Sequence, residues 1–497
     1  MRASRLFAGL LVVGALVGAC STGGTATPAR PPTSAAPGSS PQAGARAPWV
    51  TPDSVGLPYP GNVEGVLTFR GNPTRTYYGR GPVPRNPRVL WRFPQAPMCG
   101  TSTDELGTDR WCGTGWTGQP AVFERGGRTW LVFGAYDGAV HFLDAGTGER
   151  ILPDLRFPDI VKGSVTVDPD GYPFVYTGAR DGLYRVISFQ GPRARVLWSI
   201  NADSVSPHLW SNDWDGAALP LGDYLFEGGE NSQFHVFKLN RGYGPGGEAT
   251  VRPELVFHVP GWDDELLAAI RDTDVSIENS VAIFRDTVYF ANSGGLVQGW
   301  DLSGVRDGVP PRRVFRFWTG DDTDASVVVD GNGALYVGSE WERHNTRSRD
   351  VGQIMKLDPG KSGNPLVWSL PDQGADRAGV WATPALYRDL VIVPTLSGRD
   401  LGIDRATGRV RWTKLLPSQT VASPVVVDGV WLQGDCTGTL RAFDLAASYP
   451  NEPKEIWSIR LADRCIESTP AVWKGRIYLG TRDGYEVAVG NLDAPTR

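Results

Sequence analysis

One pattern of short apolar segments recurs eight times along this chain. Each copy follows a small residue or a proline with an alternating apolar strand, two further strands that end near glycine and near Asp, and a last strand with an aromatic residue. The copies begin near Pro120, Val165, Ala218, Val281, Val327, Pro384, Pro424 and Pro470. Four short antiparallel strands at this period are typical of one propeller blade. We therefore expect an all-β, eight-bladed β-propeller of four-stranded antiparallel blades.

The last copy lacks its fourth strand, because only four residues follow Asp493. Residues 89–93 (VLWRF), near the other end of the sequence, have the character of the missing strand. Pairing this segment with the last blade would close the ring and remove its exposed sheet edges. The sequence thus predicts a propeller over residues 89–493, preceded by an N-terminal lead-in over residues 49–88.

The composition favours the same fold. The chain contains 62 Gly, 39 Pro and 18 Trp residues but only 5 His and 3 Met, which suits many short strands joined by tight turns. We expect the tryptophans that end the repeats to pack between neighbouring blades: Trp91, Trp198, Trp368, Trp412 and Trp457. The formal net charge of -5 gives no basic face, so no nucleic-acid partner is expected.

The N-terminus has the pattern of an export signal. Arg2 and Arg5 precede fourteen uncharged, mostly apolar residues, a run too short to span a bilayer. The sequence VGAC that ends at Cys20 resembles the bacterial lipobox. This resemblance implies a signal peptide over residues 1–19 and acylation of Cys20, for example with palmitate. A secretory signal with an incidental cysteine is the alternative.

Residues 20–48 are then the lipidated cysteine and a tether. Of the 28 residues from Ser21 to Pro48, 25 are Ser, Thr, Gly, Ala or Pro, so the segment cannot bury enough apolar area to fold. An acyl anchor would hold the protein on a lipid membrane without crossing it. We expect a location on the extracytoplasmic face of the cell membrane, with the choice between inner and outer membrane left open.

Four cysteines remain besides Cys20, and an even number suits an oxidising compartment. We expect the disulfides Cys99–Cys112 and Cys436–Cys465, because each pair brackets or joins loops on one face of the propeller. A zinc site is the rival interpretation, but the sequence has no Cys-x-x-Cys spacing and no nearby pair of histidines.

The repeat turns DAGTG at Asp144 and DRATG at Asp404, the tryptophans that end the repeats, and FRGNPTRTYYG at 69–79 resemble the pyrroloquinoline quinone-type β-propeller superfamily. The resemblance covers about residues 62–493. It implies the propeller fold and, with the lipobox, a bacterial lipoprotein member. The superfamily includes calcium-dependent quinoprotein alcohol dehydrogenases and cofactor-free lipoproteins of envelope assembly, so the fold alone does not choose between these functions.

The loops that lead into the innermost strands share a face with the loops that join the middle strands. One helix is expected there at 263–271, and residues 339–352 are an insertion. The residues just before the innermost strands should encircle the axis: Thr117, Lys162, Asp215, Glu278, Asp324, Trp381, Val421 and Glu467. Four of these eight are acidic, which raises their pKa values unless a cation, Lys162 or water offsets the charge.

We call the region of the axis that these eight residues encircle the acidic funnel, and three interpretations of it stay open. It is solvated or hydrogen-bonded to the backbone, or Asp215, Glu278 and Asn279 bind Ca²⁺, or it is catalytic. The resemblance implies for catalysis that pyrroloquinoline quinone lies over the funnel, with Asp324 as the base and Trp381 and Lys162 against the cofactor. The sequence departs from the quinoprotein pattern, because Glu278 and Asn279 are adjacent, no two cysteines are adjacent, and no Cys-x-x-Cys-His is present.

The sequence therefore favours a binding or scaffold module whose loop-rich face binds a protein or a cell-envelope polymer. A dehydrogenase of alcohols or sugars that depends on pyrroloquinoline quinone and Ca²⁺ is the alternative.

Overall fold

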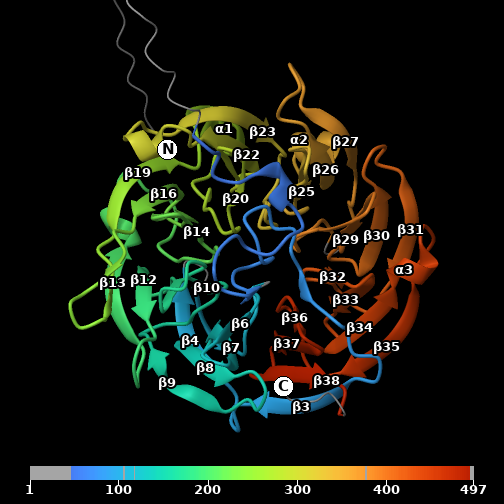
Figure 1. Ribbon diagram of the computed structural model, residues 1–497. Coiled ribbons are helices and arrows are strands. Elements are labelled where there is room, and N and C mark those ends of the chain that lie inside the picture. Colours follow the sequence, from blue (N-terminus) through green and yellow to red (C-terminus); the bar gives the residue numbers. More distant parts are fainter. Residues whose placement is uncertain (1–45, 105–106, 117, 375–377, 493–497) are drawn as a thin grey trace, which may run out of the picture. The chain divides into compact units, whose positions relative to one another are not determined.

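Eight sheets follow one another around a ring in the computed structural model, in the order of the sequence repeats (Figure 1). The structure describes residues 46–104, 107–116, 118–374 and 378–492. The predicted signal peptide, Cys20 and the predicted tether as far as residue 45 lie outside these ranges. The innermost strands begin within one residue of the eight expected positions, and the eight-bladed propeller is confirmed.

The first four blades hold sixteen of the strands. Blade 1 has β6 (Ala121–Arg125), β7 (Arg128–Ala135), β8 (Ala139–Asp144) and β9 (Arg150–Arg156); blade 2 has β10 (Thr166–Val167), β11 (Phe174–Thr177), β12 (Leu183–Ser188) and β13 (Arg195–Asn201); blade 3 has β14 (Leu219–Leu221), β15 (Tyr224–Gly228), β16 (Gln233–Lys238) and β19 (Glu254–Pro260); blade 4 has β20 (Ala282–Phe284), β21 (Thr287–Phe290), β22 (Leu296–Asp301) and β23 (Arg312–Trp318).

The other four blades repeat this arrangement. Blade 5 has β24 (Val328–Val329), β25 (Leu335–Gly338), β26 (Ile354–Leu357) and β27 (Leu366–Leu370); blade 6 has β28 (Ala385–Tyr387), β29 (Leu390–Val393), β30 (Arg399–Asp404) and β31 (Val410–Leu415); blade 7 has β32 (Val425–Val427), β33 (Val430–Gly434), β34 (Thr439–Asp444) and β35 (Lys454–Arg460); blade 8 has β36 (Ala471–Trp473), β37 (Arg476–Gly480), β38 (Glu486–Gly490) and β3 (Arg88–Phe93).

The remaining elements lie in loops. They are the hairpins β4 (Cys99–Asp104) with β5 (Gly107–Cys112) and β17 (Gly242–Tyr243) with β18 (Ala249–Thr250), the helices α1 (Asp264–Ile270), α2 (Thr346–Val351) and α3 (Leu445–Ser448), and three 3-10 turns at Pro52–Ser54, Ala202–Ser204 and Val305–Asp307. The expected helix is α1, capped by Asp263, whose carboxylate accepts a hydrogen bond from the Leu266 N–H. Two helices are not predicted from the sequence: α2, which lies in the 339–352 insertion, and α3. None of the helices in the described part of the chain has the length and apolar character that a membrane crossing requires.

The ring is closed as the sequence predicts. Strand β3 pairs antiparallel with β38, with Trp91 opposite Ala488 and Phe93 opposite Glu486. The outer strand of the last blade therefore comes from the start of the propeller, and the two ends of the ring belong to one sheet (Figure 1).

The inner strands are buried on both faces because a blade stacks on each side. All four residues of β29 and all five of β33 are buried, which explains the apolar runs LVIV in β29 and VWL in β33. Trp91 and Trp368, at the ends of blades 8 and 5, each cover a turn of the next blade. Trp91 lies over Gly148 and donates a hydrogen bond from its indole N–H to the Ala145 carbonyl. A Cβ at Gly148 would lie 2.7 Å from the Trp91 ring, which explains the glycine.

The lead-in adds strands at the inner edges of two blades. β1 (Gly65–Val66) pairs antiparallel with β6, and β2 (Gly79–Arg80) pairs parallel with β36. The prediction of four-stranded antiparallel blades is therefore corrected for blades 1 and 8, which have five strands.

Between β1 and β2 the chain crosses the centre of the ring, and we call residues 65–80 the central plug (Figure 1, blue). It forms hydrogen bonds with all eight blades. The bonds that reach the six other blades include Leu67 O with Val167 N, Arg75 with Ala217 O and Val281 O, Pro73 O with Ile283 N, Thr74 O with Val329 N, and Arg70 with Pro384 O and Pro424 O.

A carboxylate away from the axis makes the fold sensitive to pH. Asp400 in β30 is fully buried, and its Oδ1 accepts a hydrogen bond of 2.9 Å from Thr420 while its Oδ2 has no partner among the described residues. Burial raises the pKa of Asp400 to about 8. A carboxyl group with a raised pKa in the folded state favours folding at low pH, and this contribution is lost as the pH rises toward 8.

We therefore expect Asp400→Asn to be more stable than the unaltered protein at pH 9 and nearly equal to it at pH 4, below which the carboxyl group is protonated in both the folded and the unfolded state. Each unit of pKa shift corresponds to about 1.4 kcal/mol, so the difference should reach a few kcal/mol. Urea unfolding across this range measures it. Equal pH dependence in the two proteins would contradict the assignment. Asp389→Asn is the opposite control, because Tyr449 and Arg411 lower the pKa of Asp389 and its replacement should destabilise at neutral pH.

Candidate functional site: the acidic funnel

One backbone hydrogen bond recurs in all eight blades at the loop-rich face. A residue after the second strand donates its N–H to a carbonyl in the loop before the innermost strand, with N···O distances of 2.8 to 3.1 Å. The donor and acceptor pairs are Tyr136 with Gly113, Arg180 with Ile160, Glu230 with Asp213, Ser293 with Ser276, Glu340 with Asp322, Leu396 with Gly379, Cys436 with Gln419, and Arg482 with Cys465. This bond defines equivalent positions in every blade.

We call the acceptor the approach residue, the residue two positions later the axial residue, and the donor the turn residue. The axial residues are Gly115, Lys162, Asp215, Glu278, Asp324, Trp381, Val421 and Glu467. Seven of them are the residues expected from the sequence. In blade 1 the bond selects Gly115, and Thr117 lies outside the described residues.

Blade 3 has three acidic residues at these positions, and Lys162 of blade 2 binds all of them. Its Nζ lies 2.6 Å from Asp215 Oδ2, 3.1 Å from Glu230 Oε1 and 3.2 Å from Asp213 Oδ2. All four residues are buried. Burial alone would lower the pKa of Lys162, but the three carboxylates hold it well above its ordinary value. Lys162 is thus the counter-charge of blade 3.

Blade 4 satisfies its acidic residue with hydroxyl groups. Glu278 Oε1 accepts hydrogen bonds from Ser276 at 2.7 Å and from Ser293 at 3.2 Å. The neighbouring Asn279 donates its side-chain amide to the carbonyls of Ala291 and Thr323, both at 2.9 Å. Asn279 therefore joins blades 4 and 5 through backbone groups.

Blade 5 repeats the three acidic residues of blade 3 without the lysine. Oxygens of Asp322, Asp324 and Glu340 lie within 4.8 Å of one another. Asp324 Oδ2 accepts a hydrogen bond of 2.7 Å from the Trp381 indole N–H. Burial, followed by the neighbouring carboxylates, raises the pKa of Asp322 and Glu340, and burial raises that of Asp324 to about 7.

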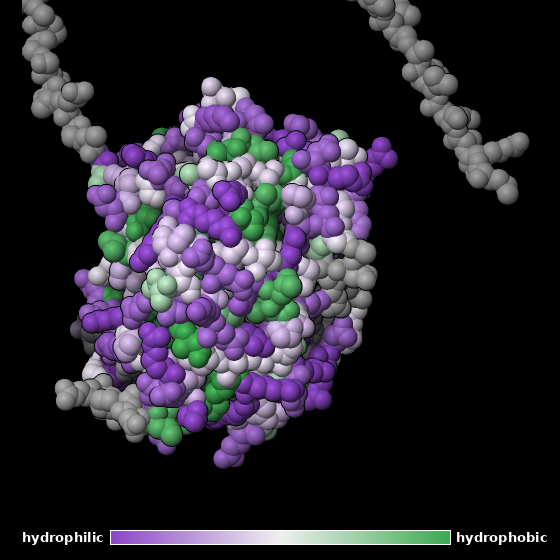
Figure 2. All heavy atoms as spheres, turned by 90° about the vertical axis from the view of Figure 1, so that its right-hand side faces the viewer, coloured by the Kyte–Doolittle hydropathy of each residue, from purple (hydrophilic) through white to green (hydrophobic). Residues whose placement is uncertain are grey.

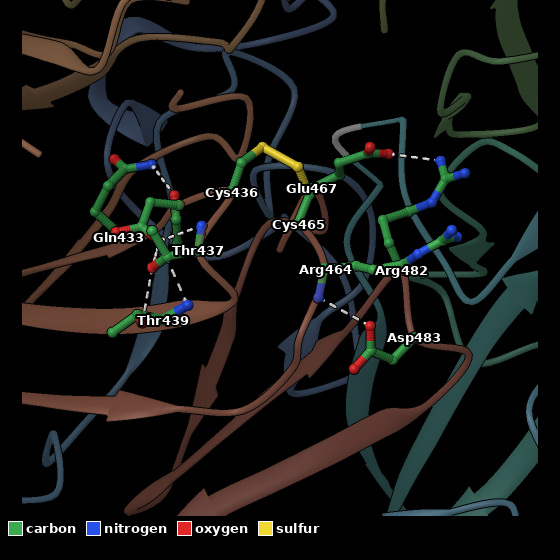
Figure 3. The surroundings of a disulfide bond; sticks show 11 residues. Gln433, Cys436, Thr437, Thr439, Arg464, Cys465, Glu467, Arg482 and Asp483 are labelled. Atoms are coloured by element: carbon green, nitrogen blue, oxygen red, sulfur yellow. Dashed lines mark hydrogen bonds and ion pairs between the residues drawn. A yellow bond between two sulfur atoms is a disulfide. The ribbon is translucent and has the colours of Figure 1, made fainter. Parts of the chain in front are cut away.

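Blade 8 closes the other side of the funnel. Glu467 forms an ion pair of 2.9 Å with its own turn residue, Arg482 (Figure 3). The disulfide Cys436–Cys465 joins the turn residue of blade 7 to the approach residue of blade 8 (Figure 3). The second predicted disulfide, Cys99–Cys112, closes the β4–β5 hairpin just before blade 1. Both predicted disulfides are confirmed.

The metal ligands expected from the sequence do lie together, but two of them already bind other groups of the protein. Asp215, Glu278, Asn279 and Asp324 line one axial cavity, with Phe69 of the central plug also in its lining. Asp215 is paired with Lys162, and the Asn279 amide holds backbone groups. The sequence does not single out Asp213, Glu230, Asp322 or Glu340. The sequence pattern that could have identified them is an Asp-x-Asp that occurs in both blades, followed by a glutamate after the next hairpin.

The cavity does not fit pyrroloquinoline quinone, the cofactor that the sequence resemblance implies. The volume open to the centre of a water-sized sphere is about 10 Å³, whereas ligand pockets of this kind enclose roughly 300 Å³ or more. Trp116 and Trp381 occupy the space, with ring centroids 4.9 Å apart at 88°. The room suffices for about one water molecule or ion.

Compared with protein-family models and with curated protein sequences, the chain matches none. Solved structures share its fold. BamB from Moraxella catarrhalis has a TM-score of 0.52 at 13% identity, covering 83% of this chain and 100% of that one. A quinohemoprotein alcohol dehydrogenase from Comamonas testosteroni has 0.54 at 13%, covering 87% and 82%. Another from Pseudomonas putida HK5 has 0.58 at 11%, covering 91% and 84%. At this identity the likeness concerns the fold alone.

Proposed function

We propose that this protein is a lipid-anchored scaffold on the extracytoplasmic face of the cell membrane, where its loop-rich face binds a protein or a cell-envelope polymer. The observation that carries the proposal is the filled axis. The protein's own side chains leave about 10 Å³ in the funnel, so a partner larger than an ion would bind outside it, and the loop-rich face lies directly around the funnel mouth. Cys20 would hold the propeller at the membrane through an acyl chain.

The loops of that face are built to hold a fixed shape. The β4–β5 hairpin is closed by one disulfide, and a second disulfide links blades 7 and 8. Helix α1 is held by its cap Asp263, which also forms ion pairs of 2.8 Å with Arg313 and Arg316. Loops fixed in this way lose little freedom on binding, which favours recognition.

Figure 2 shows one side of the ring, at right angles to the view of Figure 1. The apolar side chains on this side lie in small separate patches among hydrophilic ones. Small scattered patches are ordinary for a surface that faces solvent. This side of the ring is therefore not proposed as the binding surface.

Site-specific photocrosslinking in the native envelope tests the proposal. We expect a crosslinker at Arg110, exposed on the β4–β5 hairpin, to give a defined adduct. The matched position Arg195, exposed on outer strand β13, should give none. Adducts at Arg195 but not at Arg110 would contradict the proposed surface.

A redox assay addresses the alternative function. Because the funnel lacks room for the quinone, we expect no dye reduction when the purified protein receives pyrroloquinoline quinone, Ca²⁺ and alcohols or sugars. Dye reduction that Asp324→Asn abolishes would instead support the dehydrogenase.

A further inference from the structure

We infer that blade 5 binds one hard divalent cation of the calcium class, with Asp322, Asp324 and Glu340 as its protein ligands. This site differs from the set Asp215, Glu278 and Asn279 that the sequence suggests, and it goes beyond the proposed scaffold function.

The first support is an internal comparison between two blades. Asp213, Asp215 and Glu230 in blade 3 hold the same approach, axial and turn positions as Asp322, Asp324 and Glu340 in blade 5. The backbone bond that fixes the turn residue is also repeated, at 3.1 Å for Glu230 and 2.8 Å for Glu340. In blade 3 this arrangement surrounds a positive charge, the ammonium of Lys162, at 2.6 to 3.2 Å. The same three-carboxylate arrangement therefore holds a cation elsewhere in this chain.

The second support is the axial residue that the preceding blade places beside each acidic cluster. Lys162 is the axial residue of blade 2 and reaches the acidic residues of the following blade. The axial residue of blade 4, which stands in the same relation to blade 5, is Glu278. Blade 5 thus receives a fourth carboxylate where blade 3 receives an ammonium. The guanidinium of Arg343 also acts on Asp322 electrostatically, but its Nη groups bind Asp272 and the carbonyls of Asp274 and Ser293.

The third support is an unpartnered carboxylate directed into the cluster. Glu340 is 8% exposed, and in the described ranges its side chain makes no hydrogen bond and no ion pair. Its backbone is fixed on both sides, by the bond to Asp322 O and by the bridge to Gly379. Oδ1 of Asp322 and Oδ1 of Asp324 are buried and also without a partner among the described residues. A buried carboxylate needs a counter-charge or a proton.

The ligand chemistry selects the class of cation. All three groups are carboxylates from two loops, and Ca²⁺ accepts six to eight oxygens in a flexible geometry with water completing the shell. Mg²⁺ demands a near-ideal octahedron, and Zn²⁺ favours nitrogen and sulfur ligands, which these three residues do not offer.

Calorimetric titration of the chelator-treated full-length protein with Ca²⁺ tests the site. We expect one site, a rise of the melting temperature with Ca²⁺, and weaker binding of Mg²⁺. Terbium should bind in competition with Ca²⁺. It should luminesce on tryptophan excitation, because Trp381 is hydrogen-bonded to the ligand Asp324 and therefore lies close to the site. Glu340→Gln should weaken Ca²⁺ binding by about tenfold or more. The matched variant Glu230→Gln, in the blade that holds Lys162, should leave Ca²⁺ affinity unchanged.

A variant that is expected to be more stable than the unaltered protein separates loss of the cation site from failure to fold. Glu278→Lys places an ammonium beside blade 5 in the position that Lys162 holds beside blade 3. We expect it to melt at a higher temperature than the unaltered protein without Ca²⁺, and to lose the response to Ca²⁺. The inference is overturned if the folded protein binds no Ca²⁺, if it prefers Mg²⁺, if Glu340→Gln binds Ca²⁺ as well as Glu230→Gln does, or if Glu278→Lys keeps its Ca²⁺ response. None of these readouts depends on an envelope partner.

Discussion

Replacing Lys162 by methionine is expected to destabilise the propeller by about 3 to 5 kcal/mol, because it removes the cation that all three carboxylates of a buried cluster share and leaves the apolar stem in place. Lys162 lies within 3.2 Å of three carboxylates. Besides Lys162, only Arg180 contributes an ion pair in the described part of this cluster, at 2.9 Å from Asp213. Asp215 and Glu230 would lose the one ion pair that each forms among the described residues.

The pH dependence gives this prediction a second readout. Without the ammonium, the pKa values of Asp215 and Glu230, already raised by burial, should rise further. Carboxyl groups with raised pKa values favour folding at low pH and oppose it at high pH. The loss from Lys162→Met should therefore grow from pH 5 to pH 8 in urea unfolding. Adding Asp215→Asn and Glu230→Gln should restore part of the stability. A loss below about 1 kcal/mol at pH 8 would contradict the role of Lys162 as the counter-charge.

The blades were predictable because their signals are local. Alternation of apolar residues, the proline or small residue before the innermost strand, and the glycine-containing turns act within a few residues. These signals place all eight innermost strands. Ring closure was predictable by counting, because one strand was missing at one end and residues 89–93 were left over at the other.

The central plug was not predictable from such signals. Residues 65–80 have no strand periodicity, and their order comes from hydrogen bonds to blades up to 354 residues away in sequence, such as that from Arg70 to Pro424. The signal that was present is two arginines, Arg70 and Arg75, in a short segment that the sequence analysis treats only as a lead-in.

The funnel was predicted in part. One residue per blade was expected to face the axis, and seven of those residues do occupy the axial position. The approach and turn residues were not predicted, because their contact depends on the hairpin between them. Asp322 and Glu340 are 18 positions apart, yet the β24–β25 hairpin returns Glu340 to the Asp322 carbonyl at 2.8 Å. The pairing of strands therefore decides which acidic residues meet one another and which of them receive a counter-charge. The composition of the sequence does not decide this.

The contacts of Arg75 explain why the plug matters to stability. Its guanidinium is fully buried and donates to Phe69 O at 2.8 Å, Ala217 O at 2.7 Å and Val281 O at 2.8 Å. One side chain thus ties the plug to itself, to blade 3 and to blade 4. Burial lowers the pKa of Arg75 to about 10, so the group is still charged at neutral pH.

Arg75→Met should therefore cost about 3 kcal/mol or more, because several buried carbonyls lose their donor and each unpaired group costs about 1 to 3 kcal/mol. Arg75→Lys should recover only part of the loss, since an ammonium lacks the planar fork that reaches carbonyls of two blades. Arg80→Met is the matched control, because Arg80 is exposed and its 3.7 Å pair with Glu64 is a surface contact. Urea unfolding measures all three, and limited proteolysis should cut the lead-in faster in Arg75→Met alone. Equal stability of Arg75→Met and Arg80→Met would mean that only strands β1 and β2 hold the plug in place. The buried guanidinium of Arg75 would then contribute nothing to the stability of the fold.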